Sequence, residues 1–265
     1  MRRLQTLART RKDAEVHQVV PGVSVRVFHP PVAPTSEPGP ALLWIHGGGY
    51  VIGSAAQDDS LCQRFADELG VLVASVDYRL APEFPYPTPV EDCYGALQWL
   101  ADRAEVNHTQ IAIGGASAGG GLAASIAILA RDRAVITPIF QLLAYPMLDD
   151  RTDTVSTEHR LWDAKSNRFA WDSYLGSTPA EVAAPAHAKD LSELPSAWIG
   201  VGTLDLFHDE DLTYAARLEQ AGVPCTVTEV PGAFHGFDLV AARAAVSREF
   251  FDTQCGVLRA AFQRA

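Results

Sequence analysis

A serine between closely spaced glycines is the first feature of this sequence that could carry chemistry. Gly115-x-Ser117-x-Gly119 matches the G-x-S-x-G pattern of a nucleophile elbow, in which a tight turn between a strand and a helix presents a serine hydroxyl above a sheet. The amide of Ala118 would begin the following helix, where an N–H has no intrahelical partner and can face a developing oxyanion. Glycine-rich loops also contain this pattern by chance, so its surroundings decide the interpretation.

The spacing of the same loop argues against a phosphate cradle. A P-loop requires Lys and then Ser or Thr after its last glycine, whereas Gly120 and Gly121 follow Gly119 here. The G-x-G-x-x-G spacing of a dinucleotide site is absent from the loop as well. No nucleotide or dinucleotide cofactor is therefore indicated.

A second glycine cluster, His46-Gly47-Gly48-Gly49, follows a compact apolar run over residues 41–45. Consecutive glycines cost backbone entropy, and their benefit is that bare backbone lets a ligand approach the amide N–H groups. A flexible loop is the alternative, but His-Gly-Gly-Gly directly after a strand is an esterase motif. The position therefore favours an oxyanion-binding loop.

A serine nucleophile needs an imidazole to take its proton and a carboxylate to orient that imidazole. Asp205 and His235 each follow a predicted buried strand, as Ser117 does, and active residues collect at the carboxyl ends of parallel strands. The chain order Ser, Asp, His is that of the α/β-hydrolase layout. Asp209, one helical turn later, is kept as the reserve acid. The remaining histidines are interpreted as surface residues or, in one case, as part of the glycine motif: His108, His159, His187, His208 and His46.

Buried strands that alternate with amphipathic helices must position these groups, which predicts a mostly parallel sheet covered on both faces. Two alternating runs around Pro21-Gly22 predict an antiparallel hairpin at the sheet edge, and residues 1–14 a short helix or loose tail. The predicted strands are 16–20, 23–28, 41–45, 71–76, 111–113, 138–144, 196–201 and 225–230. The predicted helices are 58–69, 91–100, 122–130, 210–220 and 239–262. Closely spaced prolines predict that the second of them begins only after Val90.

Residues 148–193 interrupt this alternation and predict a cap insertion over the site. Trp171, Tyr174 and Leu175 share one helical face within it. They could attach the insertion to the body, line an acyl pocket, or do both.

Composition limits the class of protein. The chain has 265 residues, of which 48% are hydrophobic, and this predicts one α/β domain over residues 1–265. A formal net charge of −11 and an isoelectric point near 5.1 argue against nucleic acid and anionic membranes as partners. The helix predicted over 239–262 could support a homodimer, although nothing in its pattern requires one.

The four cysteines are scattered without zinc-type spacing, which favours free thiols in a reducing compartment and no metal site. The first residues show no secretory signal, and no apolar run approaches the roughly 20 residues of a membrane-spanning helix. We therefore expect a cytoplasmic protein without stable membrane insertion.

Four motifs in order resemble those of the hormone-sensitive-lipase-like family of α/β-hydrolases, from about residue 40 to the end. They are His46-Gly47-Gly48-Gly49, Asp77-Tyr78-Arg79-Leu80-Ala81-Pro82-Glu83, Gly115-Ala116-Ser117-Ala118-Gly119-Gly120 and Gly232-Ala233-Phe234-His235-Gly236-Phe237. Within the second motif, Arg79 and Glu83 are expected to support the loops rather than to do chemistry.

The resemblance implies an α/β-hydrolase fold and a serine carboxylesterase that hydrolyses short-chain acyl esters through an acyl-enzyme, without metal or organic cofactor. It implies Ser117 as nucleophile, His235 as base and Asp205 as acid. It further implies an oxyanion hole made of the amides of Gly48, Gly49 and Ala118, with Gly47 close by.

The sequence leaves two alternative functions open and departs from the family pattern at two points. The same triad could serve an amidase, deacetylase or carbamate hydrolase, or the fold could have become an inactive small-ligand-binding module, against which the intact set of residues argues. Relatives often carry an acidic residue where this chain has Ala116. The region before the first strand is short, so the pocket is expected to be more open or to be covered by a partner chain.

Overall fold

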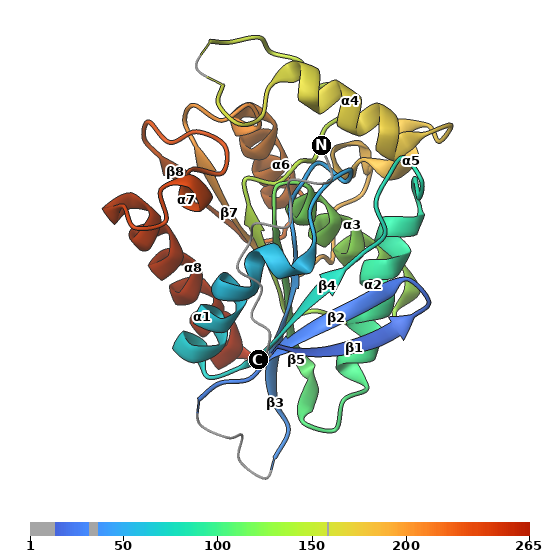
Figure 1. The fold of residues 1–265 in the computed structure, drawn as a ribbon, viewed down its shortest axis with the longest axis vertical. Helices are drawn as coiled ribbons and strands as arrows, with labels where there is room; N and C mark the ends of the chain where they lie inside the picture. Colours follow the sequence, from blue (N-terminus) through green and yellow to red (C-terminus); the bar gives the residue numbers. More distant parts are fainter. Residues whose placement is uncertain (1–13, 32–36, 158) are drawn as a thin grey trace.

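A single eight-stranded sheet runs through the molecule (Figure 1). The computed structural model describes residues 14–31, 37–157 and 159–265, so the helix or tail predicted for residues 1–14 lies almost wholly outside the described residues. The strand order is β1-β2-β4-β3-β5-β6-β7-β8. The strands are β1 (Glu15–Val20), β2 (Val23–Phe28), β3 (Gly39–Ile45), β4 (Leu72–Asp77), β5 (Val106–Ala116), β6 (Phe140–Ala144), β7 (Ser196–Gly202) and β8 (Cys225–Val230).

The sheet is antiparallel only at the β1 edge. β2 pairs antiparallel with both β1 and β4, and every later neighbouring pair is parallel. The predicted edge hairpin and the mostly parallel sheet are therefore confirmed. The parallel register brings the carboxyl ends of β3, β5, β7 and β8 to one edge, where the candidate residues follow.

Helices cover both faces of the sheet. They are α1 (Asp59–Leu69), α2 (Thr88–Ala101), α3 (Ala118–Arg133), α4 (Ala164–Leu175), α5 (Ala180–Ala183), α6 (His208–Gln220), α7 (Phe237–Val240) and α8 (Ala245–Arg264), with 3-10 turns η2 (Ala55–Asp58) and η3 (Pro185–His187). Buried residues of α2, α3 and α6 pack on one face, and those of α1 and α8 on the other. In the described part of the chain, no helix combines the length and apolar character needed to cross a bilayer.

The two cores follow from the alternation of side chains along each buried strand. In β3, Leu43 and Ile45 join the core under α2 and α3, whereas Leu42 and Trp44 join the core under α1 and α8. Because both faces are covered, the strand is apolar along its length, as the sequence indicated.

The start of α2 differs from the prediction. The helix begins at Thr88 rather than after Val90, with Pro89 inside its first turn. Proline fits there because an N–H at this position has no intrahelical partner to lose. Asp92 of this helix binds the Arg79 guanidinium at 2.9 and 2.6 Å, which confirms the expected supporting role of Arg79.

The prediction of a single closing helix over 239–262 was also wrong. The chain forms the short α7, leaves helical geometry around Ala241–Ala244, and re-enters it as α8. These residues are good helix formers, so the local sequence favours continuity. Packing overrides it, because α7 places Asp238 against Tyr145 while α8 buries Phe250 and Phe251 against the sheet.

Candidate active site

Ser117 occupies the turn between β5, which ends at Ala116, and α3, which begins at Ala118. Its backbone has φ 57° and ψ −122°, a conformation that is strained for a residue with a Cβ atom. The turn is held on both sides: the Ser117 amide donates to the Ala144 carbonyl at 2.9 Å, and its carbonyl accepts from the Met147 amide at 3.0 Å. This geometry is that of the predicted nucleophile elbow.

The glycine at position 119 allows the elbow to lie close to β3. A Cβ atom at Gly119 would lie 2.0 Å from the carbonyl oxygen of Ile45, well inside any allowed contact. A side chain there would force α3 away from the strand. The spacing of the motif is therefore a packing requirement of the turn.

The sheet edge brings the three candidate catalytic residues into one hydrogen-bonded chain. His235 Nε2 lies 2.9 Å from Ser117 Oγ, and His235 Nδ1 lies 2.9 Å from Asp205 Oδ2. Asp205 follows β7 and His235 follows β8, so each comes from the carboxyl end of its strand. All three side chains are buried. Asp205 Oδ1 also accepts the Phe207 amide at 3.0 Å, which fixes the carboxylate plane.

Two other carboxyls, the reserve acid Asp209 and Asp238, are engaged elsewhere. Asp209 pairs with His208 and is almost fully exposed. Asp238 accepts the Tyr145 hydroxyl at 2.7 Å, and the Tyr145 ring contacts the edge of the His235 ring at a centroid distance of 5.0 Å. Tyr145 thus packs beside the histidine, a contact that the sequence did not indicate.

The glycine loop after β3 lines the same cavity as Ser117. Gly48 has φ +125°, and a Cβ atom there would lie 2.0 Å from the Ile52 carbonyl oxygen. In the described part of the chain, the amides of Gly48, Gly49 and Ala118 donate to no protein group. His46 is buried with its ring stacked on Tyr78, whose hydroxyl donates to the His46 carbonyl at 3.0 Å. The histidine therefore supports the loop, as expected from its place in the glycine motif.

A cavity of about 250 Å³ opens beside Ser117 and His235. Its walls are largely apolar and include Ile52, Ala116, Leu161, Trp162 and Leu239. Leu161 and Trp162 come from the 148–193 segment, and a Cβ atom on Gly49 would lie 2.2 Å from the Trp162 ring. The sequence predicted that this segment lies over the site but assigned no lining role to these two residues, because nothing in their local pattern distinguishes a cavity wall from a core.

The aromatic face of α4 attaches the segment to the body. Tyr174 stacks on Tyr50 at 4.0 Å between ring centroids, and Trp171 meets the edge of the same ring at 5.4 Å. Neither residue lines the cavity beside Ser117. Of the two predicted roles, the structure supports attachment for this face.

Asp58, at the end of η2, is a buried carboxyl in the cavity wall. Its Oδ2 accepts the Trp44 indole N–H at 2.8 Å. Burial raises the pKa of Asp58 to about 7. No sequence pattern singles out this residue, since an acidic residue before a helix usually acts as a cap.

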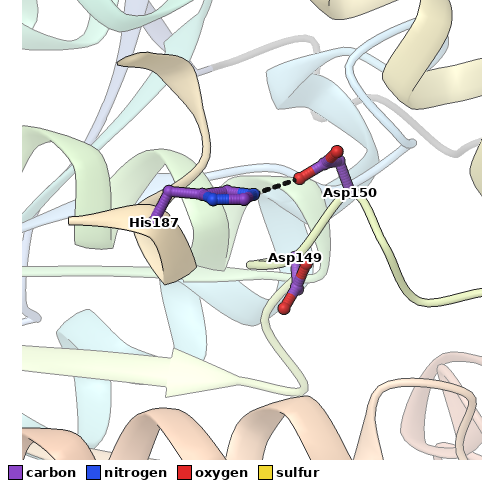
Figure 2. Close-up of side chains that lie close together, drawn as sticks. All are labelled: Asp149, Asp150 and His187. Atoms are coloured by element: carbon purple, nitrogen blue, oxygen red, sulfur yellow. Dashed lines mark hydrogen bonds and ion pairs between the residues drawn. The ribbon is translucent and has the colours of Figure 1, made fainter. Parts of the chain in front are cut away.

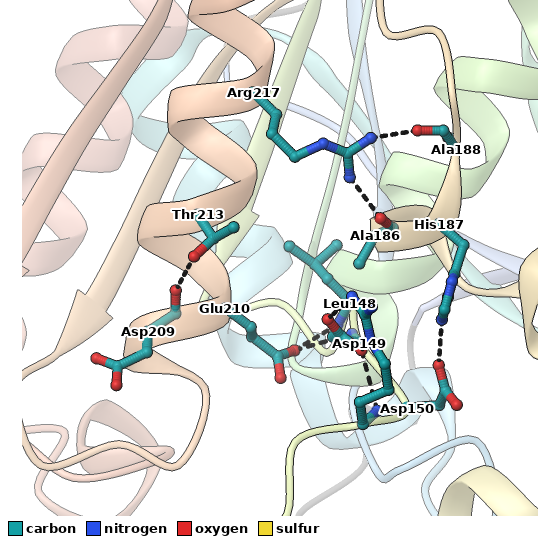
Figure 3. Close-up of polar contacts among 11 residues, drawn as sticks. Leu148, Asp149, Asp150, Ala186, His187, Ala188, Asp209, Glu210, Thr213 and Arg217 are labelled. Atoms are coloured by element: carbon teal, nitrogen blue, oxygen red, sulfur yellow. Dashed lines mark hydrogen bonds and ion pairs between the residues drawn. The ribbon is translucent and has the colours of Figure 1, made fainter.

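Glu210 lies in the first turn of α6 and ties the loop after β6 to that helix (Figure 3). Its Oε1 accepts the Leu148 amide at 2.7 Å and the Asp149 amide at 3.1 Å. Burial raises the pKa of Glu210 to about 8. The same loop contains Met147, which contacts both Ser117 and Tyr50, so Glu210 supports the elbow from a distance.

Asp149, Asp150 and His187 form the one cluster of the described residues with spacing suited to a metal ion (Figure 2). Their ligand atoms lie within 4.8 Å of one another. Asp150 is hydrogen-bonded to His187 at 2.6 Å, and Asp149 holds Arg151 at 2.6 Å. The Asp150–His187 pair joins the two ends of the 148–193 segment, and together with the local Asp149–Arg151 pair it accounts for the cluster without an ion.

A nucleophile elbow, a glycine-rich amide loop and a Ser-His-Asp chain at the carboxyl edge of a mostly parallel sheet define an α/β hydrolase. Residues 42–239 match a family described by the alpha/beta hydrolase fold. The chain belongs to that family, in its hormone-sensitive-lipase-like branch, as its motifs indicated.

Its relatives are named as esterases. Esterase LipI of Mycobacterium tuberculosis is 36% identical over 227 residues, covering 81% of this chain and 71% of the relative. Ethyl acetate hydrolase of Pseudomonas putida is 35% identical, covering 80% of this chain and 70% of the relative. The solved structure named Bacterial Heroin Esterase superposes with a TM-score of 0.88 at 40% identity, covering 97% and 87% of the two chains. The predicted class, a carboxylic ester hydrolase, is confirmed.

Proposed function

We propose that this carboxylic ester hydrolase uses Ser117 as nucleophile, His235 as general base and acid, and Asp205 to orient the imidazole. Ser117 Oγ attacks the ester carbonyl while His235 Nε2 takes its proton, and the histidine then protonates the leaving alcohol. Water, deprotonated by the same histidine, attacks the acyl-serine and releases the acid. Each step uses the same short path between serine and imidazole.

We propose that the tetrahedral oxyanion binds the amides of Gly48, Gly49 and Ala118. These three donors come from two loops that meet at Ser117, and they donate to no group in the described part of the chain. Fixed donors of this kind stabilise the charge that develops in the transition state. Removing one such donor typically costs about 10²–10³ in kcat.

The single observation that carries the proposal is the continuous chain from Ser117 Oγ through His235 to Asp205, with 2.9 Å at each of its two links. A chain of this geometry has no structural need of its own, since three apolar residues would fill the space with less desolvation cost. The strained backbone of Ser117 supports the same assignment.

The size of the cavity supports short acyl esters as substrates. About 250 Å³ lies just below the usual range of small-molecule sites, which suits an acetyl or butyryl ester better than a long fatty acyl chain. We further propose that residues 148–193 act as the cap of this cavity, because Trp162 reaches Gly49. Four unpaired cysteines are consistent with a cytoplasmic, reducing location.

Hydrolysis of p-nitrophenyl acetate, butyrate, octanoate and palmitate by the wild type and by Ser117→Ala tests the proposal. We expect activity on the two short esters and little on palmitate, with a loss of about 10⁵–10⁶ in kcat in the variant. An unchanged circular dichroism melt would show that the variant is folded. Equal activity of both proteins would overturn the assignment of Ser117. An amidase or deacetylase would instead favour the matching p-nitroanilide.

A further inference from the structure

Asp58 is a buried carboxyl that the proposed mechanism does not use. It lines the cavity that also contains Ser117, His235 and Tyr145, and only 3% of its surface is exposed. It occupies the N-cap position of α1, yet its side chain makes no capping hydrogen bond. Helix capping therefore does not account for an acid at this position.

One oxygen of this carboxyl is fixed and the other is available. Oδ2 accepts the Trp44 indole N–H at 2.8 Å, which locks the orientation of the side chain. Within residues 14–31, 37–157 and 159–265, no protein donor is assigned to Oδ1, and that atom is not among the fully buried ones. The carboxyl thus presents an acceptor to a largely apolar cavity.

The surroundings make this end of the cavity electronegative. Among the described residues that line it there is neither lysine nor arginine. The neighbouring Asp59 is already paired with Arg26 at 2.6 Å. Asp238 of α7 lies outside the cavity wall, adds negative charge near Asp58 and accepts the Tyr145 hydroxyl, while His235 is hydrogen-bonded to Asp205. No fixed cation of the cavity wall neutralises Asp58.

A buried carboxylate without a cationic partner is costly unless a ligand supplies one. The raised pKa of Asp58, about 7, expresses that cost, and a substrate ammonium group would offset it. A carboxylate on the substrate would meet like charge and would be rejected.

We propose that Asp58 is a specificity-determining residue that binds an ammonium group on the ester substrate and so selects cationic short-chain esters over neutral and anionic ones. The inference rests on the proposed function, because it names the class of ester taken by the same site. No bond is made or broken at Asp58. Its carboxylate accepts a charge-assisted hydrogen bond from the substrate N–H while Ser117 performs the chemistry.

Pairs of esters of equal shape test the inference. 2-(Dimethylamino)ethyl acetate and 3-methylbutyl acetate differ by a protonated nitrogen in place of a CH group in the alcohol, and ethyl 3-(dimethylamino)propanoate and ethyl 4-methylpentanoate differ in the same way in the acyl part. The readout is the ratio of kcat/KM within each pair. Comparing that ratio between wild type and Asp58→Asn cancels intrinsic reactivity. Asparagine keeps an oxygen for the Trp44 indole N–H.

We expect Asp58→Asn to lower the cationic-to-neutral ratio by about tenfold in at least one pair, as for a hydrogen bond to a charged group. Asp238→Asn is the matched control, since it removes a nearby carboxyl that does not line the cavity, and we expect a smaller change. Ratios that Asp58→Asn leaves unchanged in both pairs would overturn the inference. An equal drop of the ratio in Asp238→Asn would also overturn it, because the effect would then arise from the overall negative electrostatic potential near the cavity and not from Asp58 itself.

The wild type alone provides a second test that does not depend on the folding of a variant. Because the pKa of Asp58 is about 7, the ratio should rise as the pH increases from 6 to 7.5, where the amine stays protonated. Both esters of a pair undergo the same acyl transfer at Ser117, so the ratio removes the pH dependence of that step. A flat ratio contradicts the inference. Failure of the proposed function would give a different result from failure of this inference, because wild type and Ser117→Ala would then hydrolyse the neutral ester equally.

Discussion

The elbow around Ser117 and the segment of residues 148–193 border the same cavity but are held by different kinds of contact. The elbow is positioned by backbone: its amide and carbonyl are hydrogen-bonded within the sheet edge, and Gly119 lets β3 approach within a distance that no side chain permits. The segment is positioned by side chains from distant parts of the chain. Tyr50 packs against the Tyr174 ring of α4. Glu210 accepts the Leu148 amide in the loop after β6, and Arg217 donates to two carbonyls of the segment (Figure 3).

This difference predicts that substitutions in the two regions affect different properties, namely the catalytic rate and the stability of the fold. Backbone constraints leave the catalytic atoms little freedom, so changes there should act on kcat. Side-chain packing is distributed over many contacts, so changes there should act first on the free energy of unfolding. Three variants test this separation.

The largest effect is expected at Asp205, the proposed acid of the triad. Asp205→Asn keeps the shape of the side chain and an acceptor for the Phe207 amide, but it no longer stabilises the correct tautomer and the imidazolium of His235. We expect kcat on p-nitrophenyl butyrate to fall about 10⁴-fold with a nearly unchanged melting temperature. Asp209→Asn is the matched control, since that carboxylate is exposed, and it should retain its activity. A loss of less than tenfold in Asp205→Asn would contradict the assigned role.

A smaller effect, and one on stability, is expected in α4. Trp171→Ala removes a fully buried ring that packs against Tyr50 and Tyr174, and such truncations cost about 3–5 kcal/mol of unfolding free energy. Urea unfolding measures the loss, and Trp171→Phe should recover part of it. We expect kcat of the folded protein to change far less than in Asp205→Asn. A catalytic loss without destabilisation would break the distinction between the two regions.

The smallest effect concerns Glu210 and is visible only as a pH dependence. Its pKa is about 8 in the folded protein against an ordinary value of 4.5, so the folded state holds the proton more tightly. The contribution of Glu210 to stability is therefore largest below pH 4.5 and is lost as the pH rises towards 8. Glu210→Gln removes this titration and keeps an acceptor for the Leu148 and Asp149 amides.

The stability of Glu210→Gln relative to the wild type should accordingly increase by about 2–3 kcal/mol between pH 5 and pH 7. Unfolding by urea at both pH values measures it. If the two proteins kept a constant difference, Glu210 would be ionised in the folded state and its burial would carry no such cost.

Much of this molecule was predictable from its sequence because its elements are locally encoded. Apolar runs with β-branched residues marked the buried strands, and Gly70 marked the end of α1, where it adopts the left-handed conformation of a C-cap. The failures were at helix ends. Pro89 fitted inside the first turn of α2, and the good helix formers between α7 and α8 were overridden by packing on both sides.

The amino-acid sequence by itself determined the sheet, the order of the site residues and the family, because a strained turn and a close backbone approach demand particular residue types at particular spacings. Ser117 and the glycines around it are such positions. The tertiary structure alone decided which side chains line the cavity beside Ser117 and which support the elbow from outside it. Asp58, Tyr145, Trp162 and Glu210 stand in ordinary local patterns, and their roles arise from contacts with residues far along the chain. Burial and partners, rather than residue type, set the chemistry of those groups.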